Sequence, residues 1–389
     1  MSSEWQEIAQ SIKGIYGNEE FIPLHEPTFN EKEIEYVTDC IRTGWVSSVG
    51  KYVDAFEKRL AGYTGVKRAV AVVNGTAALH IALKAAGVQA NDEVFMPALT
   101  FIATANAVSY LQAVPHFVDV SEQTLGLDPI KLEEHIHEIG EIKNGQLINK
   151  KTGRVIRAVV PMHTFGHPVA LDELIDVCAR YNLVLVEDAA ESLGSFYKGK
   201  HTGGFGAVSA LSFNGNKIMT TGGGGAILTN DEKLADYAKH ITTTAKIPHS
   251  WEYRHDEIAF NYRMPNINAA LGCAQLEKMD EFLLSKRKLT QRYQNLFESV
   301  EGVTLFTEPS YGTSNYWLQT IILDDEKHNR DSVLDVLNRK GIMARPIWMP
   351  INKLIPYKAS PAGDLSVTNV LNGKIINIPS SPTKKEVIK

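Results

Sequence analysis

The sequence predicts an α/β protein with a mainly parallel sheet, helices on both faces of that sheet, and a smaller α+β C-terminal domain. Four consecutive apolar residues at 183–186 suit a strand buried on both faces, as strands of parallel sheets are. Strand and helix patterns alternate through the first half of the chain, which favours right-handed crossovers. Because 389 residues are too many for one simple core, we expect two domains, residues 1–245 and 246–389.

The expected elements follow one another in a regular order. Asn30 and Glu33 form a capping box that starts a helix, and Gly44 is placed to end it. Asn144 and Gly145 predict a hairpin turn. Strands are expected at 68–73, 93–97, 114–120, 155–163, 183–186, 208–213 and 226–229, and helices at 77–86, 231–241, 267–300 and 331–340.

Composition narrows the class of protein. Apolar residues make up 44% of the chain and charged residues 22%, as in globular proteins, and the net charge of -5 argues against a nucleic-acid partner. The three cysteines have no paired spacing, which argues against a disulfide framework or a metal site and fits a reducing cytoplasm. We expect no signal peptide and no membrane span, since no stretch approaches roughly 20 apolar residues.

An acid and a lysine follow two neighbouring strands. Asp188 ends the first strand, where open α/β sheets hold ligands. The second strand, at 208–213, breaks into an Asn-Gly-Asn turn that leads to Lys217, and glycines follow at 222–225. The sequence therefore predicts a lysine on a tight loop beside a carboxylate at one sheet edge.

These residue types suit pyridoxal phosphate. A lysine amine attaches to an aldehyde once it has lost its proton, and a carboxylate keeps a pyridine nitrogen protonated. Hydroxyls such as that of Ser212, together with glycine N–H groups, satisfy phosphate oxygens. Taken singly, an acid at a strand end is more often a cap, a loop lysine is usually solvated and a glycine run is usually a turn. Their joint order carries the cofactor prediction.

Two segments resemble the DegT/DnrJ/EryC1/StrS family: residues 187–194 (EDAAESLG) and residues 212–225 (SFNGNKIMTTGGGG). The resemblance extends over about residues 22–381. It implies the type I aspartate aminotransferase fold and pyridoxal phosphate-dependent transamination of nucleotide-linked keto-sugars. It also implies that Lys217 is the covalent anchor of the cofactor, that Asp188 faces the ring nitrogen, and that Glu191 makes a supporting contact beside the ring.

The resemblance implies further site residues. Gly75 and Thr76 match a phosphate-gripping helix start, and Phe101 matches an aromatic residue stacked on the ring. Trp45 and Arg345 match segments near the mouth of the site, where they would bind substrate. The alternatives from the residues alone stay open: a plain helix cap for residues 74–76, a core position for Phe101, and a packed loop with a buried Trp45.

Residues 261–264 (NYRM) match a family segment whose asparagine reaches the phosphate of the partner subunit's cofactor. Carried over to Asn261, this implies a homodimer with shared active sites. The alternative is that Asn261 caps the helix expected to start near Pro265.

Residues 217–225 resemble the branch of the family that transfers the amino group to sugar C4. Gly223, together with residues 213–216, resembles enzymes that make UDP-linked 4-amino-4,6-dideoxy-N-acetylhexosamines for bacterial glycans, with glutamate as amino donor. The alternatives are a GDP- or dTDP-linked keto-sugar, a regulator that binds the cofactor without turnover, and a nucleotide-binding protein that uses the glycine run. A lysine at 217, where family dehydratases have histidine, favours transamination.

Overall fold

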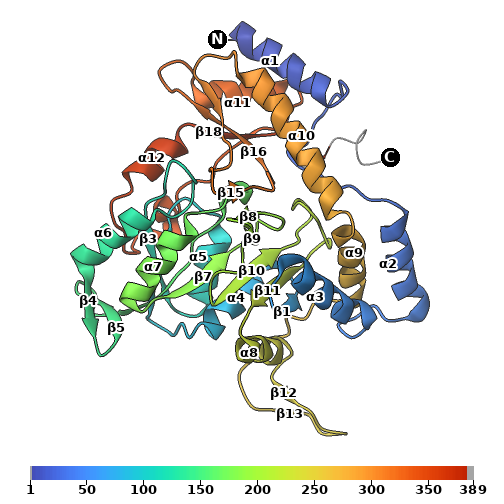
Figure 1. Cartoon of the computed structure of the whole chain (residues 1–389), viewed down its shortest axis with the longest axis vertical. Coiled ribbons are helices and arrows are strands. Elements are labelled where there is room, and N and C mark those ends of the chain that lie inside the picture. The colour runs from blue at the N-terminus through green and yellow to red at the C-terminus, as the bar shows by residue number, and fades with distance from the viewer. Residues whose placement is uncertain (1, 383–389) are drawn as a thin grey trace.

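The structure, a computed structural model, describes residues 2–382 (Figure 1). A mixed sheet lies at its centre, and its main path runs β1-β11-β10-β7-β6-β2-β3. Strands β10, β7, β6, β2 and β3 pair in parallel, whereas β11 pairs antiparallel with both of its neighbours. The predicted mainly parallel sheet is confirmed. The strands are β1 (Arg68–Val72), β2 (Glu93–Pro97), β3 (Val114–Val118), β6 (Val155–Val159), β7 (Val184–Asp188), β10 (Val208–Ser212) and β11 (Gly225–Thr229).

Helices cover both faces of this sheet, as predicted. One face packs through a buried cluster that includes Leu79, Val108 and Ile241, and the other through clusters that include Phe56 and Leu174. The helices of the first face are α4 (Gly75–Ala85), α5 (Ile102–Tyr110) and α8 (Glu232–Thr242). Those of the second are α3 (Lys51–Thr64), α6 (Pro129–Ile139), α7 (Leu171–Tyr181) and α9 (Asn266–Leu276).

The C-terminal part forms an antiparallel sheet in the order β14-β16-β18-β17. The N-terminal helix packs here, because Trp5 and Ile12 are buried with Tyr293 and Leu337 (Figure 1). The elements are α1 (Ser2–Ile15), α10 (Met279–Phe297), α11 (Arg330–Arg339), α12 (Ser366–Asn372), β14 (Val303–Leu305), β16 (Gln319–Leu323), β17 (Arg345–Pro346) and β18 (Ile375–Ile378). The division into residues 1–245 and 246–389 stays a prediction.

Smaller elements connect these layers. The predicted turn at Asn144 and Gly145 joins β4 to β5, and both residues have positive φ. A second hairpin, β12–β13, extends below the sheet in Figure 1. The elements are β4 (Gly140–Lys143), β5 (Gln146–Asn149), β8 (Phe196–Tyr197), β9 (Lys200–His201), β12 (Lys246–Ile247), β13 (Arg254–His255), β15 (Gly312–Thr313), and the 3₁₀ turns η1 (Thr164–Gly166), η2 (Ile351–Lys353) and η3 (Ile355–Tyr357).

Helix α2 (Glu31–Thr43) begins with the predicted capping box. The Asn30 side chain accepts from the N–H of Lys32, and Glu33 accepts from the N–H of Asn30 at 2.7 Å. Gly44 ends the helix with a φ of 75°. Two apolar side chains of this helix stay exposed in the part of the chain that the structure describes: Ile34 is 60% exposed and Ile41 62%.

The single helix predicted over 267–300 is wrong: α9 and α10 are separate, with Glu277 and Lys278 between them. No glycine or proline marks this break in the sequence. Tertiary contacts cause it, because α9 packs against α2 and α3 whereas α10 packs against β14 and α1. The Lys278 ammonium is buried at the junction and pairs with Glu33 of α2.

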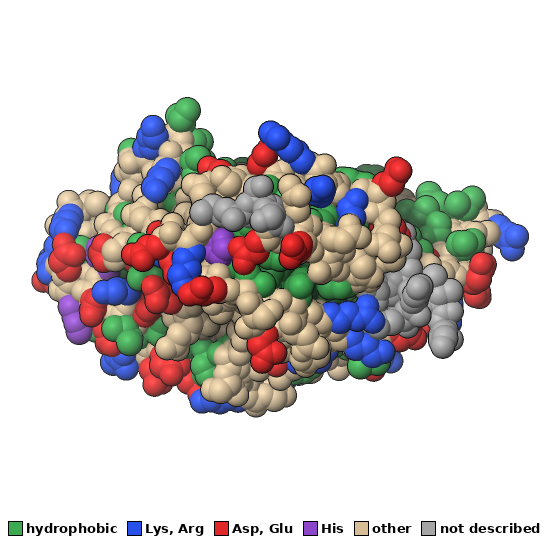
Figure 2. Space-filling model, turned by 90° about the horizontal axis from the view of Figure 1, so that it is seen from above, with side chains coloured by type: hydrophobic (Ala, Val, Ile, Leu, Met, Phe, Trp, Pro, Cys, Tyr) green, Lys and Arg blue, Asp and Glu red, His purple; other side chains and the backbone are tan. Residues whose placement is uncertain are grey.

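Charge of both signs is mixed on the face of the molecule seen from above (Figure 2). Figure 2 shows lysine and arginine side chains interspersed with aspartate and glutamate on the face drawn. Among the residues described, no helix combines the length and the apolar character needed to cross a bilayer.

Candidate active site

The carboxyl ends of β7 and β10 open into a cavity of about 270 Å³. The cavity collects most of the predicted site residues, from strands, loops and helix starts that are far apart in sequence. Its lining consists of Asn74, Gly75, Thr76, Leu79, Phe101, Ala103, Met162, Asp188, Ala190, Glu191, Ser212, Asn214, Asn216, Lys217, Trp317 and Trp348.

Asp188 is the last residue of β7 and only 2% exposed. Its Oδ2 accepts a hydrogen bond from Thr104 Oγ1 at 2.7 Å, and its Oδ1 accepts from the N–H of Ala190 at 3.2 Å. Burial raises the pKa of this carboxyl, although the two hydrogen bonds oppose the shift. A cationic partner would therefore be strongly favoured beside it.

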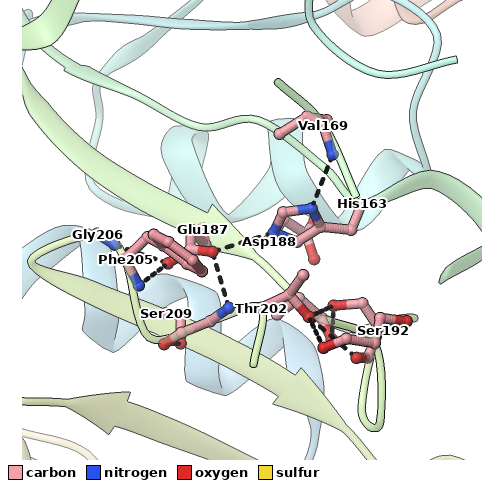
Figure 3. Close-up of polar contacts among 12 residues, drawn as sticks. His163, Val169, Glu187, Asp188, Ser192, Thr202, Phe205, Gly206 and Ser209 are labelled. Atoms are coloured by element: carbon pink, nitrogen blue, oxygen red, sulfur yellow. Dashed lines mark hydrogen bonds and ion pairs between the residues drawn. The ribbon is translucent and has the colours of Figure 1, made fainter. Parts of the chain in front are cut away.

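Glu187, one residue earlier, points to the other side of the strand and is fully satisfied (Figure 3). Its carboxylate accepts from the N–H groups of Gly203, Phe205 and Gly206 at 2.6–2.7 Å. His163 accepts from the N–H of Val169 at Nδ1, so its Nε2 carries the proton and donates to Glu187 at 3.1 Å. Burial alone would raise the pKa of Glu187, but His163 and the N–H donors hold it below its usual value. His163 thus acts as architecture beneath the site.

Lys217 lies on the loop after β10, as predicted. The loop is a tight turn, with the Lys217 N–H donating to the carbonyl of Asn214 at 3.0 Å. The Lys217 Nζ lies 3.2 Å from Glu191 Oε1 and 3.8 Å from the centroid of the Trp317 ring. Lysine, Glu191 and Asp188 therefore line the same cavity.

The start of α4 forms the end of the cavity that is suited to bind a phosphate group. Asn74 is the N-cap, and its Oδ1 accepts from the N–H of Ala77 at 2.8 Å. The first N–H groups of a helix have no partner within the helix and favour anions. A Cβ on Gly75 would lie 2.7 Å from Ser212 Cβ, so only glycine allows this close approach. The cap alternative is thus confirmed for Asn74, and it leaves Gly75 and Thr76 facing the cavity.

These residues fit pyridoxal phosphate. An anion-binding helix start, a buried carboxylate and a lysine line one cavity, and Phe101 adds an aromatic wall. Phe101 is 49% exposed, so the core alternative for it is wrong.

Three predicted site residues lie elsewhere in the single chain. Trp45 is 57% exposed after α2, so the alternative of a buried tryptophan is wrong. Arg345 is exposed on β17, where its Nη1 donates to Asn338 Oδ1. Asn261 is exposed, and its backbone forms an antiparallel β-bridge with Thr243. The N-cap of α9 is Pro265, so the alternative that Asn261 caps this helix is wrong. Their roles in binding stay predictions.

Sequence reasoning missed Thr104, which holds Asp188 from outside the cavity lining, and the two tryptophans of the cavity wall. Thr104 holds Asp188 from 84 positions away, and the signal available was its place one helical turn after Phe101. Trp317 and Trp348 also line the cavity, and the ring of Trp348 contacts that of Phe101. The Trp317 Nε1 donates to the carbonyl of Asn216 at 2.7 Å. Nothing in the local sequence of either tryptophan separates a cavity wall from a core position.

Comparison with known proteins agrees with this geometry. The family model of the DegT/DnrJ/EryC1/StrS aminotransferase family matches residues 27–387. The chain is 39% identical over 331 residues to EpsN of Bacillus subtilis (strain 168), named as a candidate pyridoxal phosphate-dependent aminotransferase; the match covers 85% of this chain and 82% of EpsN.

A second relative is the GDP-perosamine synthase of Caulobacter vibrioides, 38% identical over 361 residues, with 92% of this chain and 93% of that protein covered. Among solved structures, the aminotransferase TlmJ of Streptoalloteichus hindustanus superimposes with a TM-score of 0.83 at 26% identity, covering 92% of this chain and 93% of TlmJ.

Proposed function

Because the chain belongs to the DegT/DnrJ/EryC1/StrS aminotransferase family and is a pyridoxal phosphate-dependent sugar aminotransferase, we propose that it transfers the amino group of glutamate to C4 of a nucleotide-linked 4-keto-6-deoxy sugar. The product would serve bacterial surface glycan synthesis in the cytoplasm. The observation that carries the site assignment is the single cavity that joins Lys217, Asp188 and the start of α4. Family membership removes the two non-catalytic alternatives.

Each side chain has a distinct part in this proposal. Bound pyridoxal phosphate supplies an aldehyde carbon, which takes up the amino group and passes it on, and a ring that accepts electrons. Lys217 anchors the cofactor and, once its amine is free, carries the proton at Nζ between the donor carbon and the cofactor. The Asp188 carboxylate holds the proton on the ring nitrogen. Phe101 covers the ring face. Gly75, Thr76 and Ser212 bind the phosphate.

UDP, GDP and dTDP are the candidate nucleotides of the substrate, and specific observations favour the first two. Gly223 and residues 213–216 favour UDP-2-acetamido-2,6-dideoxy-4-keto-hexose, whereas the relative named GDP-perosamine synthase favours a GDP-linked sugar. We further propose that the exposed side chains of Trp45 and Arg345 contact the sugar nucleotide.

A panel of UDP-, GDP- and dTDP-linked 4-keto-6-deoxy sugars, assayed with glutamate, separates the candidates. We expect one nucleotide to give a higher kcat/KM than the others by at least about 10-fold, as a difference of one satisfied polar contact would cause. The measurement is 2-oxoglutarate release together with the mass of the amino sugar. If no sugar of the panel gives repeated turnover and an amino sugar product, the proposed substrate class is contradicted.

We also propose a homodimer with shared sites. Large apolar side chains stay exposed in the single chain on α2, on the segment after it and on the β12–β13 hairpin, a pattern that marks protein interfaces. They are Ile34, Ile41, Trp45, Val49, Ile247, Trp251 and Tyr253. In the proposed dimer, Asn261 reaches the phosphate of the partner's cofactor.

Mixing two variants, each inactive at a cofactor concentration too low to load Asn261→Ala, tests the shared site. Lys217→Ala removes the anchor, and Asn261→Ala removes the contact proposed to cross the interface. If sites are shared, a mixed dimer has one site with both defects and one with neither. Activity should therefore return toward about half of the wild-type value per mixed dimer, as one intact site of two gives.

The control for this mixing test is Asn261→Ala alone, which should fold normally and bind the cofactor more weakly. Mixed dimers can be isolated by two affinity tags. If isolated mixed dimers recover no activity, Asn261 does not complete the partner's site.

A further inference from the structure

The amine of Lys217 has two partners in the cavity wall. Its Nζ lies 3.2 Å from Glu191 Oε1 and 3.8 Å from the centroid of the Trp317 ring. The lysine side chain is only 13% exposed and that of Glu191 only 2%. A carboxylate and the face of an indole are both groups that stabilise an ammonium ion, and both do so more strongly away from water.

Both partners are held in place by contacts that do not involve Lys217. Glu191 Oε2 accepts from the N–H of Phe165 at 2.9 Å, and Phe165 adopts the left-handed region with a φ of 55°. The Trp317 Nε1 donates to the carbonyl of Asn216, and the Trp317 carbonyl accepts from the buried Lys286 Nζ at 2.9 Å. The two groups therefore form a site that is shaped before the amine arrives.

The surroundings of this position raise the affinity of the Glu191 carboxylate for a proton. Burial raises the pKa of Glu191 to about 7, with Lys217 opposing the shift and Asp188 adding to it. Burial, followed by Lys286 and Lys217, holds the pKa of His25 well below its usual value, so His25 stays a neutral imidazole and adds no competing charge. Glu191 is thus the carboxyl placed to exchange a proton with Lys217.

We propose that Glu191 and Trp317 form a holding site that receives the Lys217 amine whenever it is not attached to the cofactor. The Trp317 ring and the Glu191 carboxylate stabilise Lys217 as an ammonium ion. A proton then passes from Nζ to Glu191 Oε1, which leaves a neutral amine and a carboxylic acid. The reverse transfer restores the ion pair. Glu191 and Trp317 are positioning residues in this scheme, and the inference rests on the proposed role of Lys217 but not on the identity of the sugar.

The test measures the Lys217 amine directly. Full-length enzyme loaded with pyridoxamine phosphate, the form in which the lysine is free, is labelled with trace acetic anhydride from about pH 6 to about pH 10, and the extent of labelling at each lysine is read by peptide mass spectrometry. Glu191→Gln keeps the shape but removes the charge. It should lower the apparent pKa of Lys217 by about one unit, which corresponds to about 10-fold more labelling near pH 8. Trp317→Leu should lower it in the same direction.

Trp348→Phe is the matched control, because Trp348 lines the same cavity while its ring contacts Phe101 and Phe165. It should leave the Lys217 profile unchanged. The buried Lys278, which is 4% exposed and pairs with Glu33, reports in the same digest whether each variant is folded, because its labelling rises on unfolding, and the exposed Lys198 and Lys200 serve as the reference for full reactivity. Glu191→Asp offers a second carboxylate variant if Glu191→Gln folds poorly, and it should give an intermediate pKa. An unchanged or raised pKa of Lys217 in folded Glu191→Gln would overturn the holding site. The sugar panel can fail without changing this result, so the two proposals are tested separately.

Discussion

Lys217→Ala should lower kcat by several orders of magnitude while the protein stays folded. In the proposed mechanism Lys217 is the one residue that attaches covalently to the cofactor. Contacts that only bind the cofactor cannot perform the steps of such a residue. The matched control is Lys200→Ala, since Lys200 is an exposed lysine over the ring of Phe205. That control should retain turnover. Borohydride reduction of the wild-type holoenzyme and peptide mapping should find the pyridoxyl group on Lys217; a label on Lys198 or Lys200 would contradict the assignment.

The same variant should change how stability depends on pH. Without Lys217, Glu191 loses its ion-pair partner and keeps a raised pKa, because burial is the main cause of the shift. Between its unfolded pKa of about 4.3 and its folded value, the folded state binds a proton that the unfolded state lacks, so stability falls as pH rises. Lys217→Ala should therefore lose more stability, relative to wild type, near pH 8 than near pH 5.5. Urea denaturation of the cofactor-free proteins at these two pH values measures this.

Asp188→Asn should lower kcat by about 10²- to 10³-fold or more, as the loss of other preorganised electrostatic contacts does. The substitution keeps the side-chain shape and an oxygen that can accept from Thr104, but it removes the charge that holds a proton on the ring nitrogen. Steady-state kinetics at saturating glutamate and sugar nucleotide measures the loss.

Stability provides the control for Asp188→Asn. Burial raises the pKa of Asp188 in the cofactor-free chain, so its ionisation costs stability as pH rises above the unfolded value. The neutral asparagine should leave the cofactor-free protein as stable as wild type or more so. Near-normal activity in this variant would move the proposed role to another group, whereas a fall in activity together with unfolding would assign Asp188 to the core instead.

Local patterns predicted much of the fold and of the site, because local chemistry determines those parts. The apolar run before Asp188 and the turn before Lys217 appear in the sequence and in the structure. Thr104 and Trp317 were missed because their contacts join residues 84 and 101 positions apart. The break between α9 and α10 was missed for the same reason: its cause is packing against helices elsewhere in the chain.

The alternation of Glu187 and Asp188 along β7 has a consequence for folding. Successive side chains of a strand point to opposite faces, so a slip of one residue would move each carboxylate to the face that the other normally occupies. A slip in one direction would bring Glu187 to Thr104 and leave Val186 facing the N–H donors of Gly203 and Gly206. A slip in the other direction would bring Asp188 to those donors and leave Ala189 facing Thr104. Binding of the cofactor by a refolding chain should consequently report when β7 has found its pairing with β6 and β10, and a misregistered intermediate should be compact but unable to bind the cofactor.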